Sequence, residues 1–185
     1  MLTNHEHATS VWVRRFAPLI RPGGHVLDLA AGAGRHTRLL LDMGLSVTAV
    51  DRNVEALRPL AGARCSVQEI DLESGVPENA LGALGSGYDG IVVTNYLHRP
   101  LFPVLAKALA PGGVVIYETF AVGNERLGRP SNPDFLLRIG ELLEVFAALT
   151  VIAFEQGEVA VPRPAVIQRI AAIAGPLGRL PEPAE

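Results

Sequence analysis

The chain has 185 residues, of which 49% are hydrophobic and 19% charged, and its formal net charge is −3 at pH 7. A chain of this length and hydrophobicity can bury a core of its own, which excludes an intrinsically disordered protein. The slightly acidic balance, with basic residues scattered rather than clustered, gives no support to a nucleic-acid-binding surface. The single cysteine excludes an intramolecular disulfide and a cysteine-based metal site.

The N-terminal region and the cysteine bear on the cellular compartment. The residues before Ser10 are polar, and the apolar run after it is interrupted by Arg14 and Arg15, so we expect neither a signal peptide nor a membrane-spanning helix. The lone Cys65 fits a reducing compartment. These features predict a cytoplasmic protein without a membrane partner. The sequence leaves open whether the protein is a monomer or a homodimer.

The first part of the chain predicts a helix, a strand, a glycine turn and a second helix. Apolar residues recur at helical spacing after Ser10, a suitable N-cap, and Pro22-Gly23-Gly24 ends the segment. A short apolar strand over residues 25–30 leads into the turn at residues 31–34 and an amphipathic helix that ends at Gly44. This order is the opening of a βαβ unit.

Strands and helices then alternate, which predicts a doubly wound parallel sheet. Two final strands joined directly predict an antiparallel hairpin at one edge of that sheet. We therefore expect an α/β fold with a mostly parallel seven-stranded sheet, in one domain over residues 1–175, followed by a flexible tail at 176–185. The further predicted strands cover residues 46–50, 65–70, 88–94, 113–119, 150–155 and 165–173, and the further predicted helices cover 54–61, 100–109 and 134–147.

The strongest local signal is the turn after the first strand, where Asp28 precedes Gly32 and Gly34. Glycine lets a ligand approach the backbone, and the following helix offers free N–H groups. The dinucleotide-binding fold uses a similar turn, but Thr37 stands where its third glycine would be. The carboxylate of Asp28 would repel a pyrophosphate and would tolerate a ligand with a positive charge.

Two further carboxylates follow predicted strands. Asp51 ends the second strand, where it can accept both hydrogen bonds of a ribose diol, in either an adenosyl group or NAD. Asp71 ends the third strand, where it can accept from an adenine amino group while Leu72 packs on the ring. Three acidic strand ends around one crevice favour a cationic adenosyl ligand.

In these residues the sequence resembles the class I S-adenosylmethionine-dependent methyltransferases, over about Trp12 to Ile173. The acidic-x-Gly-x-Gly-x-Gly motif of that family is present as Asp28-x-Ala30-x-Gly32-x-Gly34, with alanine at the first glycine. Residues 88–95 resemble its fourth strand, and residues 109–117, with Pro-Gly-Gly, resemble its turn and fifth strand. Within that family the sequence resembles small bacterial methyltransferases of the tellurite-resistance type and uncharacterised relatives of these.

The resemblance implies S-adenosylmethionine as cofactor and S-adenosylhomocysteine as product. It implies that Asp51, Asp71 and Leu72 contact the nucleoside, that Ala30 and Gly32 contact the methionine part, and that Thr94 and Asn95 lie near the methyl group. The complete implied cofactor site consists of Asp28, Ala30, Gly32, Gly34, Asp51, Arg52, Asp71, Leu72, Thr94 and Asn95.

Candidate catalytic residues follow the fourth and fifth strands. His98 can act as a general base or simply pack at a helix start, and Tyr96 can orient the acceptor, close over the cofactor or pack. Glu118 ends a buried strand and needs a partner, for which Arg99 or Arg129 is available.

The polar loop over residues 123–133 suits a lid, with Arg126 or Arg129 as a clamp for an anionic acceptor, although a solvated loop explains it equally well. Methyl transfer from a sulfonium needs a dedicated base only for a poorly nucleophilic acceptor. The absence of an insertion favours a small-molecule acceptor and no nucleic acid. No metal site is expected from His5, His7 and His36.

Two alternatives remain beside methyl transfer. An NAD-dependent oxidoreductase shares the fold and the ribose carboxylate, but Lys107 is the only lysine and no Tyr-x-x-x-Lys pair exists. A non-catalytic adenosyl-binding regulatory subunit would carry degraded motifs, whereas only Ala30 departs from the pattern.

Overall fold

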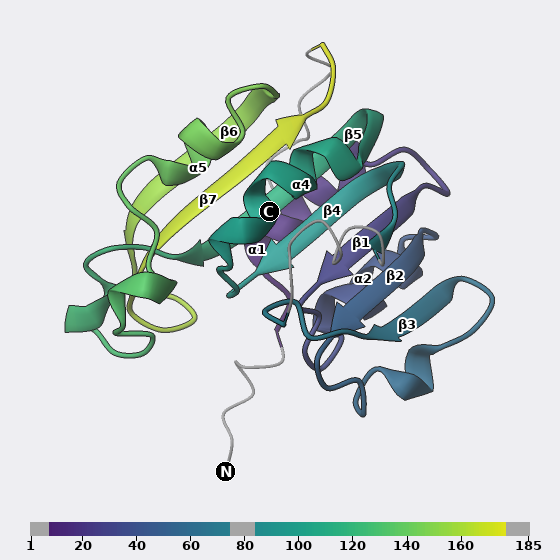
Figure 1. The fold of residues 1–185 in the computed structure, drawn as a ribbon, viewed down its shortest axis with the longest axis horizontal. Coiled ribbons are helices and arrows are strands. Elements are labelled where there is room, and N and C mark those ends of the chain that lie inside the picture. The colour runs from purple at the N-terminus through teal and green to yellow at the C-terminus, as the bar shows by residue number, and fades with distance from the viewer. Residues whose placement is uncertain (1–7, 75–83, 177–185) are drawn as a thin grey trace.

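A computed structural model describes residues 8–74 and 84–176 of the chain. It shows a sheet with helices on both faces (Figure 1). Most of the predicted tail, together with His5 and His7, lies outside the described residues. The described strands are β1 (His25–Leu29), β2 (Ser46–Asp51), β3 (Cys65–Glu69), β4 (Tyr88–Thr94), β5 (Leu109–Phe120), β6 (Thr150–Val159) and β7 (Ala165–Ile173).

The described helices precede β1 or lie between successive strands. The α-helices are α1 (Val11–Phe16), α2 (Arg35–Asp42), α4 (Phe102–Ala108) and α5 (Glu141–Val145). The 3-10 helices are η1 (Ala17–Leu19), η2 (Arg58–Leu60), η3 (Arg99–Leu101), η4 (Asn124–Arg126) and η5 (Pro133–Phe135).

The seven strands form one sheet in the order β3-β2-β1-β4-β5-β7-β6. Strands β1 to β5 run parallel, whereas β7 runs antiparallel to both β5 and β6. In Figure 1 the arrow of β7 points opposite to those of β1 and β4. The predicted α/β fold, with a mostly parallel seven-stranded sheet and an antiparallel hairpin at its edge, is confirmed.

Helices cover the sheet on both faces and bury two apolar clusters. On one face, Trp12 and Phe16 of α1 and Leu40 of α2 pack against alternate residues of β1, β4 and β5. On the other face, Leu105 of α4 and Phe146, just after α5, pack against the remaining residues of the same strands. Burial on both faces explains why these strands are almost continuously apolar in sequence.

The predicted helix over residues 54–61 is wrong. The chain forms turns there and then the short η2 helix. Side-chain acceptors compete with helical hydrogen bonds at its start, because Asp51 accepts from the Asn53 amide and Asn53 accepts from the Glu55 amide. Pro59 follows within η2 and has no N–H to donate.

The predicted helix over residues 134–147 is also mostly wrong. The backbone of Leu137 is extended, donating to the Phe120 carbonyl and accepting from the Val122 amide. This pairing with the chain after β5 prevents a helix, and α5 begins only after Gly140, whose φ is +71°. Contacts from distant sequence here override the local helical pattern.

The remaining boundaries differ from the predictions by a few residues. Strand β5 begins at Leu109 rather than at residue 113, and β6 continues to Val159 rather than ending at 155. In the part of the chain that the structure describes, no helix is long and apolar enough to cross a membrane.

Candidate functional site

A cavity of about 310 Å³ lies at the carboxyl ends of the parallel strands. We call it the strand-end cavity. Parallel strands end at the same edge of the sheet, which is where open α/β folds bind ligands. Its lining residues are Ala30, Asp51, Arg52, Ile70, Asp71, Leu72, Glu73, Tyr96 and Phe135.

The glycine turn after β1 bends through three residues with positive φ. These are Ala30 at +55°, Gly32 at +56° and Gly34 at +76°. A Cβ atom at Gly32 would meet nothing within 4 Å, so its backbone faces open space. Alanine at position 30 adopts a conformation that glycine adopts more easily, which explains why glycine is the usual residue there.

Asp51, at the end of β2, fastens this turn. Its Oδ2 accepts from the Gly32 amide at 2.8 Å and its Oδ1 accepts from the Asn53 amide at 3.0 Å. Besides the strand-end cavity, Asp51 lines a second cavity of about 400 Å³ beside Gly32 and Ala33. Each carboxylate oxygen keeps a further lone pair for a ligand hydroxyl.

Asp28 is buried behind the turn and does not line the strand-end cavity. Its Oδ2 accepts from the Thr37 hydroxyl at 2.5 Å, so it ties β1 to α2. Burial raises the pKa of Asp28 to about 6, against the lowering effects of the Thr37 hydrogen bonds and the nearby Arg35 guanidinium. Thr37 stands where the dinucleotide-binding motif has its third glycine, and here its hydroxyl binds Asp28.

The end of β3 supplies the polar and apolar sides of the strand-end cavity. Asp71 is exposed, with Oδ1 accepting from the Glu73 amide at 3.0 Å, while Leu72 is buried. Tyr96 lines the same cavity after β4, and its hydroxyl is buried without a hydrogen-bond partner among the described residues. Burial, then the carboxylates of Glu73, Asp71 and Asp51, raises the pKa of Tyr96.

Glu118 is paired differently from the prediction. Its Oε1 accepts from the Ser10 hydroxyl at 2.9 Å, and its Oε2 accepts from Arg169 Nη1 at 3.1 Å. Arg169 lies opposite Glu118 on β7. The expectation of Arg99 or Arg129 as the partner is therefore wrong, and Glu118 has its hydrogen bonds met by a strand neighbour and the N-terminal segment.

His36 joins the same polar group. Its Nε2 accepts from the Ser10 amide at 3.0 Å, which leaves the proton on Nδ1, facing the Thr94 hydroxyl at 3.3 Å. Burial, assisted by Arg35, lowers the pKa of His36 to about 3, so this ring stays neutral. Its first-turn position on α2 therefore serves to hold Ser10 and Thr94 together.

The two other candidates after β4 differ in exposure. Asn95 is exposed with φ +55°, and its amide donates to the Glu118 carbonyl at 2.9 Å. His98 is half-buried just before η3, and its carbonyl accepts from the Leu101 amide. Neither of them lines the two cavities described above.

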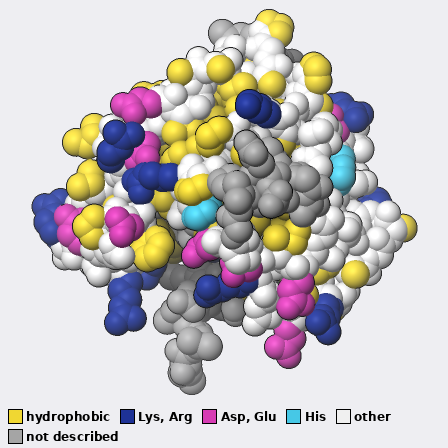
Figure 2. All heavy atoms as spheres, in the orientation of Figure 1, with side chains coloured by type: hydrophobic (Ala, Val, Ile, Leu, Met, Phe, Trp, Pro, Cys, Tyr) yellow, Lys and Arg dark blue, Asp and Glu magenta, His cyan; other side chains and the backbone are white. Residues whose placement is uncertain are grey.

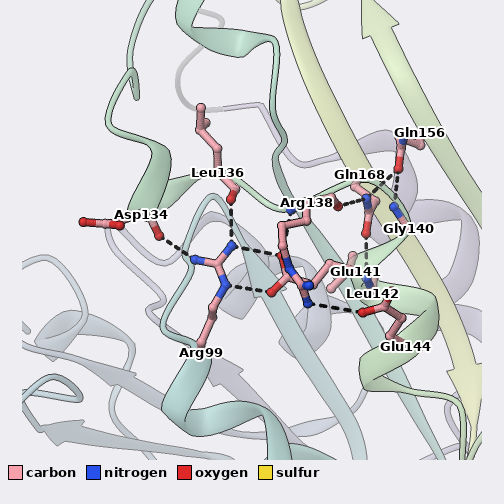
Figure 3. Close-up of polar contacts among 10 residues, drawn as sticks. All are labelled: Arg99, Asp134, Leu136, Arg138, Gly140, Glu141, Leu142, Glu144, Gln156 and Gln168. Atoms are coloured by element: carbon pink, nitrogen blue, oxygen red, sulfur yellow. Dashed lines mark hydrogen bonds and ion pairs between the residues drawn. The ribbon is translucent and has the colours of Figure 1, made fainter.

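The Arg99 guanidinium makes only contacts that hold the fold together among those described. It forms a two-point ion pair with the buried Glu141 and donates to the carbonyls of Asp134 and Leu136 (Figure 3). Burial alone would raise the pKa of Glu141, but the hydrogen bonds from Arg99 and from the Arg138 amide outweigh it and lower the pKa.

The loop over residues 123–133 is anchored through Asn124. This buried side chain donates to the Pro130 carbonyl and accepts from the Val166 amide of β7. Arg126 and Arg129 are exposed on the loop. Among residues 8–74 and 84–176, no cluster of three His, Cys, Asp or Glu side chains is arranged to hold a metal ion.

Sequence reasoning missed Ser10, Arg169 and Phe135 as parts of this region. Ser10 was identified only as a helix cap. The ion pair of Glu118 and Arg169 depends on the register of two antiparallel strands. The two residues are 51 positions apart, so no local pattern encodes their pairing. Phe135 lay inside a helix that does not form.

No protein-family model matches the sequence. Over 40 residues the chain is 50% identical to ribosomal RNA small subunit methyltransferase H of Nostoc punctiforme. That match covers 20% of this chain and only 13% of the relative.

Similar folds occur among solved structures. TehB from Haemophilus influenzae matches with a TM-score of 0.72 at 19% identity, over 90% of this chain and 62% of TehB, so this chain spans less than two thirds of TehB. The 1,6-didemethyltoxoflavin-N1-methyltransferase of Burkholderia thailandensis matches with a TM-score of 0.67 at 21% identity, over 94% of this chain and 80% of that one. That structure contains 1,6-didemethyltoxoflavin and S-adenosylhomocysteine.

Proposed function

Since the chain has the fold of the class I S-adenosylmethionine-dependent methyltransferases, we propose that it transfers a methyl group from S-adenosylmethionine to a small-molecule acceptor. S-adenosylhomocysteine is then the second product. A shared fold alone does not define a reaction. The observation that carries the proposal is the placement of Asp51. It ends β2, accepts from the Gly32 amide of the glycine turn and lines the strand-end cavity together with Asp71.

The residues present fit this cofactor. Ile70 and Leu72 offer apolar surface for a purine, and Asp51 and Asp71 offer acceptors for ribose hydroxyls and an amino group. Gly32 leaves open space, so a ligand can approach the turn closely. The 310 Å³ of the cavity falls within the usual range of small-molecule sites.

Bound S-adenosylmethionine supplies a methyl group on a sulfonium, so the main tasks of the protein are alignment and exclusion of water. In this proposal Asp51 and Asp71 hold the nucleoside. Asp28 acts without direct contact, because its ionised form favours a positive charge above the turn. Thr94 ends β4 and Asn95 follows it, and in this proposal both lie beside the acceptor. His98 then acts as a base only for a weakly nucleophilic acceptor.

A small-molecule acceptor is supported by the similar Burkholderia thailandensis structure, which holds 1,6-didemethyltoxoflavin. An RNA acceptor is the second candidate, favoured by the short similarity to an rRNA methyltransferase. The net charge of −3 argues against RNA. Figure 2 likewise shows acidic and basic side chains interspersed over one face of the molecule.

The test is transfer of labelled methyl from S-adenosylmethionine to a panel of small thiols, amines, carboxylates and oxyanions, with small-subunit rRNA as a separate arm. We expect label in one small-molecule class, with an equal amount of S-adenosylhomocysteine, and no transfer by Asp51→Ala. Label in the rRNA arm alone would reject the small-molecule acceptor. Failure of the protein to bind S-adenosylmethionine would reject methyl transfer itself.

A further inference from the structure

Phe135 lines the strand-end cavity although it belongs to a distant part of the chain. Most of the other lining residues follow β1, β2, β3 or β4, whereas Phe135 ends η5, beyond β5. Phe135 is 48% exposed, which is unfavourable for a large apolar residue. The next two residues, Leu136 and Leu137, are buried, so the chain is well packed here and yet leaves this ring at the cavity.

The side chain of Arg99 holds the backbone carbonyls on both sides of Phe135. Arg99 donates from Nη1 to the Asp134 carbonyl and from Nη2 to the Leu136 carbonyl, each at 2.8 Å. Glu141 fixes the guanidinium in turn, at 2.7 Å from Nε and 2.9 Å from Nη2 (Figure 3). A planar guanidinium held at this many points fixes the geometry of the turn.

Glu141 is itself fixed in place. It is buried, and its Oε2 accepts from the Arg138 amide at 2.7 Å. Gln168 of β7 donates to the Arg138 carbonyl and accepts from the Leu142 amide. This network connects the turn that carries Phe135 to the sheet (Figure 3).

Tyr96 adds a second aromatic ring to the same cavity. It precedes Arg99 by three residues, so one loop supplies both a ring and the guanidinium. The Tyr96 hydroxyl is buried without a partner among the described residues. A buried donor of this kind costs free energy unless a ligand or water accepts from it.

We propose that Phe135 and Tyr96 form an aromatic wall against the nucleoside of the bound cofactor, and that the Arg99–Glu141 ion pair is the device that positions Phe135. This inference rests on the proposed function. Aromatic rings contact a purine favourably through its π-face, and Ile70 and Leu72 add further apolar surface to the lining of this cavity.

The first test is calorimetric titration of the protein with S-adenosylhomocysteine and with 5′-methylthioadenosine, which lacks the amino-acid part. Phe135→Ala should weaken both ligands by the same factor, about tenfold, as the loss of one stacking ring typically does. Phe135→Tyr keeps the ring and should restore affinity to within about twofold. The matched control is Ile139→Ala, which removes a side chain 75% exposed in the same segment but outside the cavity.

The role of the Arg99–Glu141 pair in positioning residue 135 is tested with a tryptophan at that position. The only native tryptophan, Trp12, is buried, so Phe135→Trp adds a distinguishable emission. We expect S-adenosylhomocysteine to shift that emission to shorter wavelength, and the shift to disappear when Glu141→Gln is added. In a double-mutant cycle, Glu141→Gln should also remove most of the effect of Phe135→Ala, because the two act as a unit.

The outcomes separate this inference from the proposed function. If the unmodified protein binds neither nucleoside ligand, the proposed function fails and this inference fails with it. If the protein binds both ligands but Phe135→Ala binds them equally well, only the aromatic wall is rejected. If Phe135→Ala weakens binding in the same way with and without Glu141→Gln, the positioning role of the ion pair is rejected.

Discussion

Asp28 illustrates how a residue near the candidate site lowers the stability of the fold at neutral pH. The carboxylate is fully enclosed, and the hydroxyl of Thr37 is its main partner. Its pKa is about 6 in the folded protein, against a reference value of 3.8. Between these two pH values the folded protein binds more protons at Asp28 than the unfolded chain does. The free energy of unfolding therefore falls as the pH rises from 3.8 through 6, and below pH 3.8 Asp28 causes no such loss.

Asp28→Asn should therefore stabilise the fold at high pH. Asparagine cannot ionise but can still accept from Thr37, so we expect the variant to gain about 1–3 kcal/mol over the native chain at pH 8 and almost nothing at pH 4. Urea unfolding at both pH values measures the difference. Asp42→Asn, at the exposed end of α2, is the control. An equal gain at both pH values would refute this account of Asp28.

At the scale of elements, the short α1 helix depends on Ser10. The Ser10 hydroxyl accepts from the Trp12 and Val13 amides and donates to Glu118, which joins α1 to the end of β5. We expect Ser10→Ala to lower the free energy of unfolding by about 1–2 kcal/mol. Urea unfolding measures this loss, and the control variant is Val11→Ala, at an exposed position of the same helix. A loss no larger than that of Val11→Ala would show that the cap contributes little.

The Pro-Gly-Gly segment has its own structural reason. A Cβ atom at Gly113 would lie 2.6 Å from the Tyr88 carbonyl oxygen and 2.9 Å from that of Ala110. Both are backbone atoms beside the bulge between β4 and β5, so neither can move without disturbing the pairing. We expect Gly113→Ala to cost at least about 2 kcal/mol.

The control for Gly113→Ala is Gly62→Ala, where a Cβ would meet nothing within 4 Å. Thermal or urea unfolding of both variants checks the claim. Similar stability for the two variants would mean that the bulge adapts to a side chain.

Local sequence patterns predicted those elements whose hydrogen bonds are local or whose burial is complete. The apolar strands, the Ser10 cap and the helix after Gly34 were predictable because each signal lies within a few residues. The helix predicted across Leu137 was not, because its backbone pairs with Phe120 and Val122. The same limit applies to Glu118, whose partner lies on another strand.

At the scale of the whole molecule, the topology explains why the candidate site could be located from sequence. Five parallel strands bring Asp51, Asp71 and the residues after β4 to one edge of the sheet. Two of the three acidic residues predicted around one crevice, Asp51 and Asp71, therefore line one cavity, whereas Asp28 is buried behind the glycine turn. The position of Phe135 in the lining of this cavity could be found only from the fold, because the residue comes from beyond β5 and Arg99 holds the carbonyls on both sides of it.

The most direct test of the central claim is calorimetric titration of the native chain with S-adenosylmethionine and S-adenosylhomocysteine, with separate titrations of NAD and NADP as controls and Asp51→Ala as the site variant. The account predicts binding of the first two in the micromolar range, loss of that binding in Asp51→Ala, and no heat from NAD or NADP. Binding of NAD, or no binding of either adenosyl ligand, would contradict it.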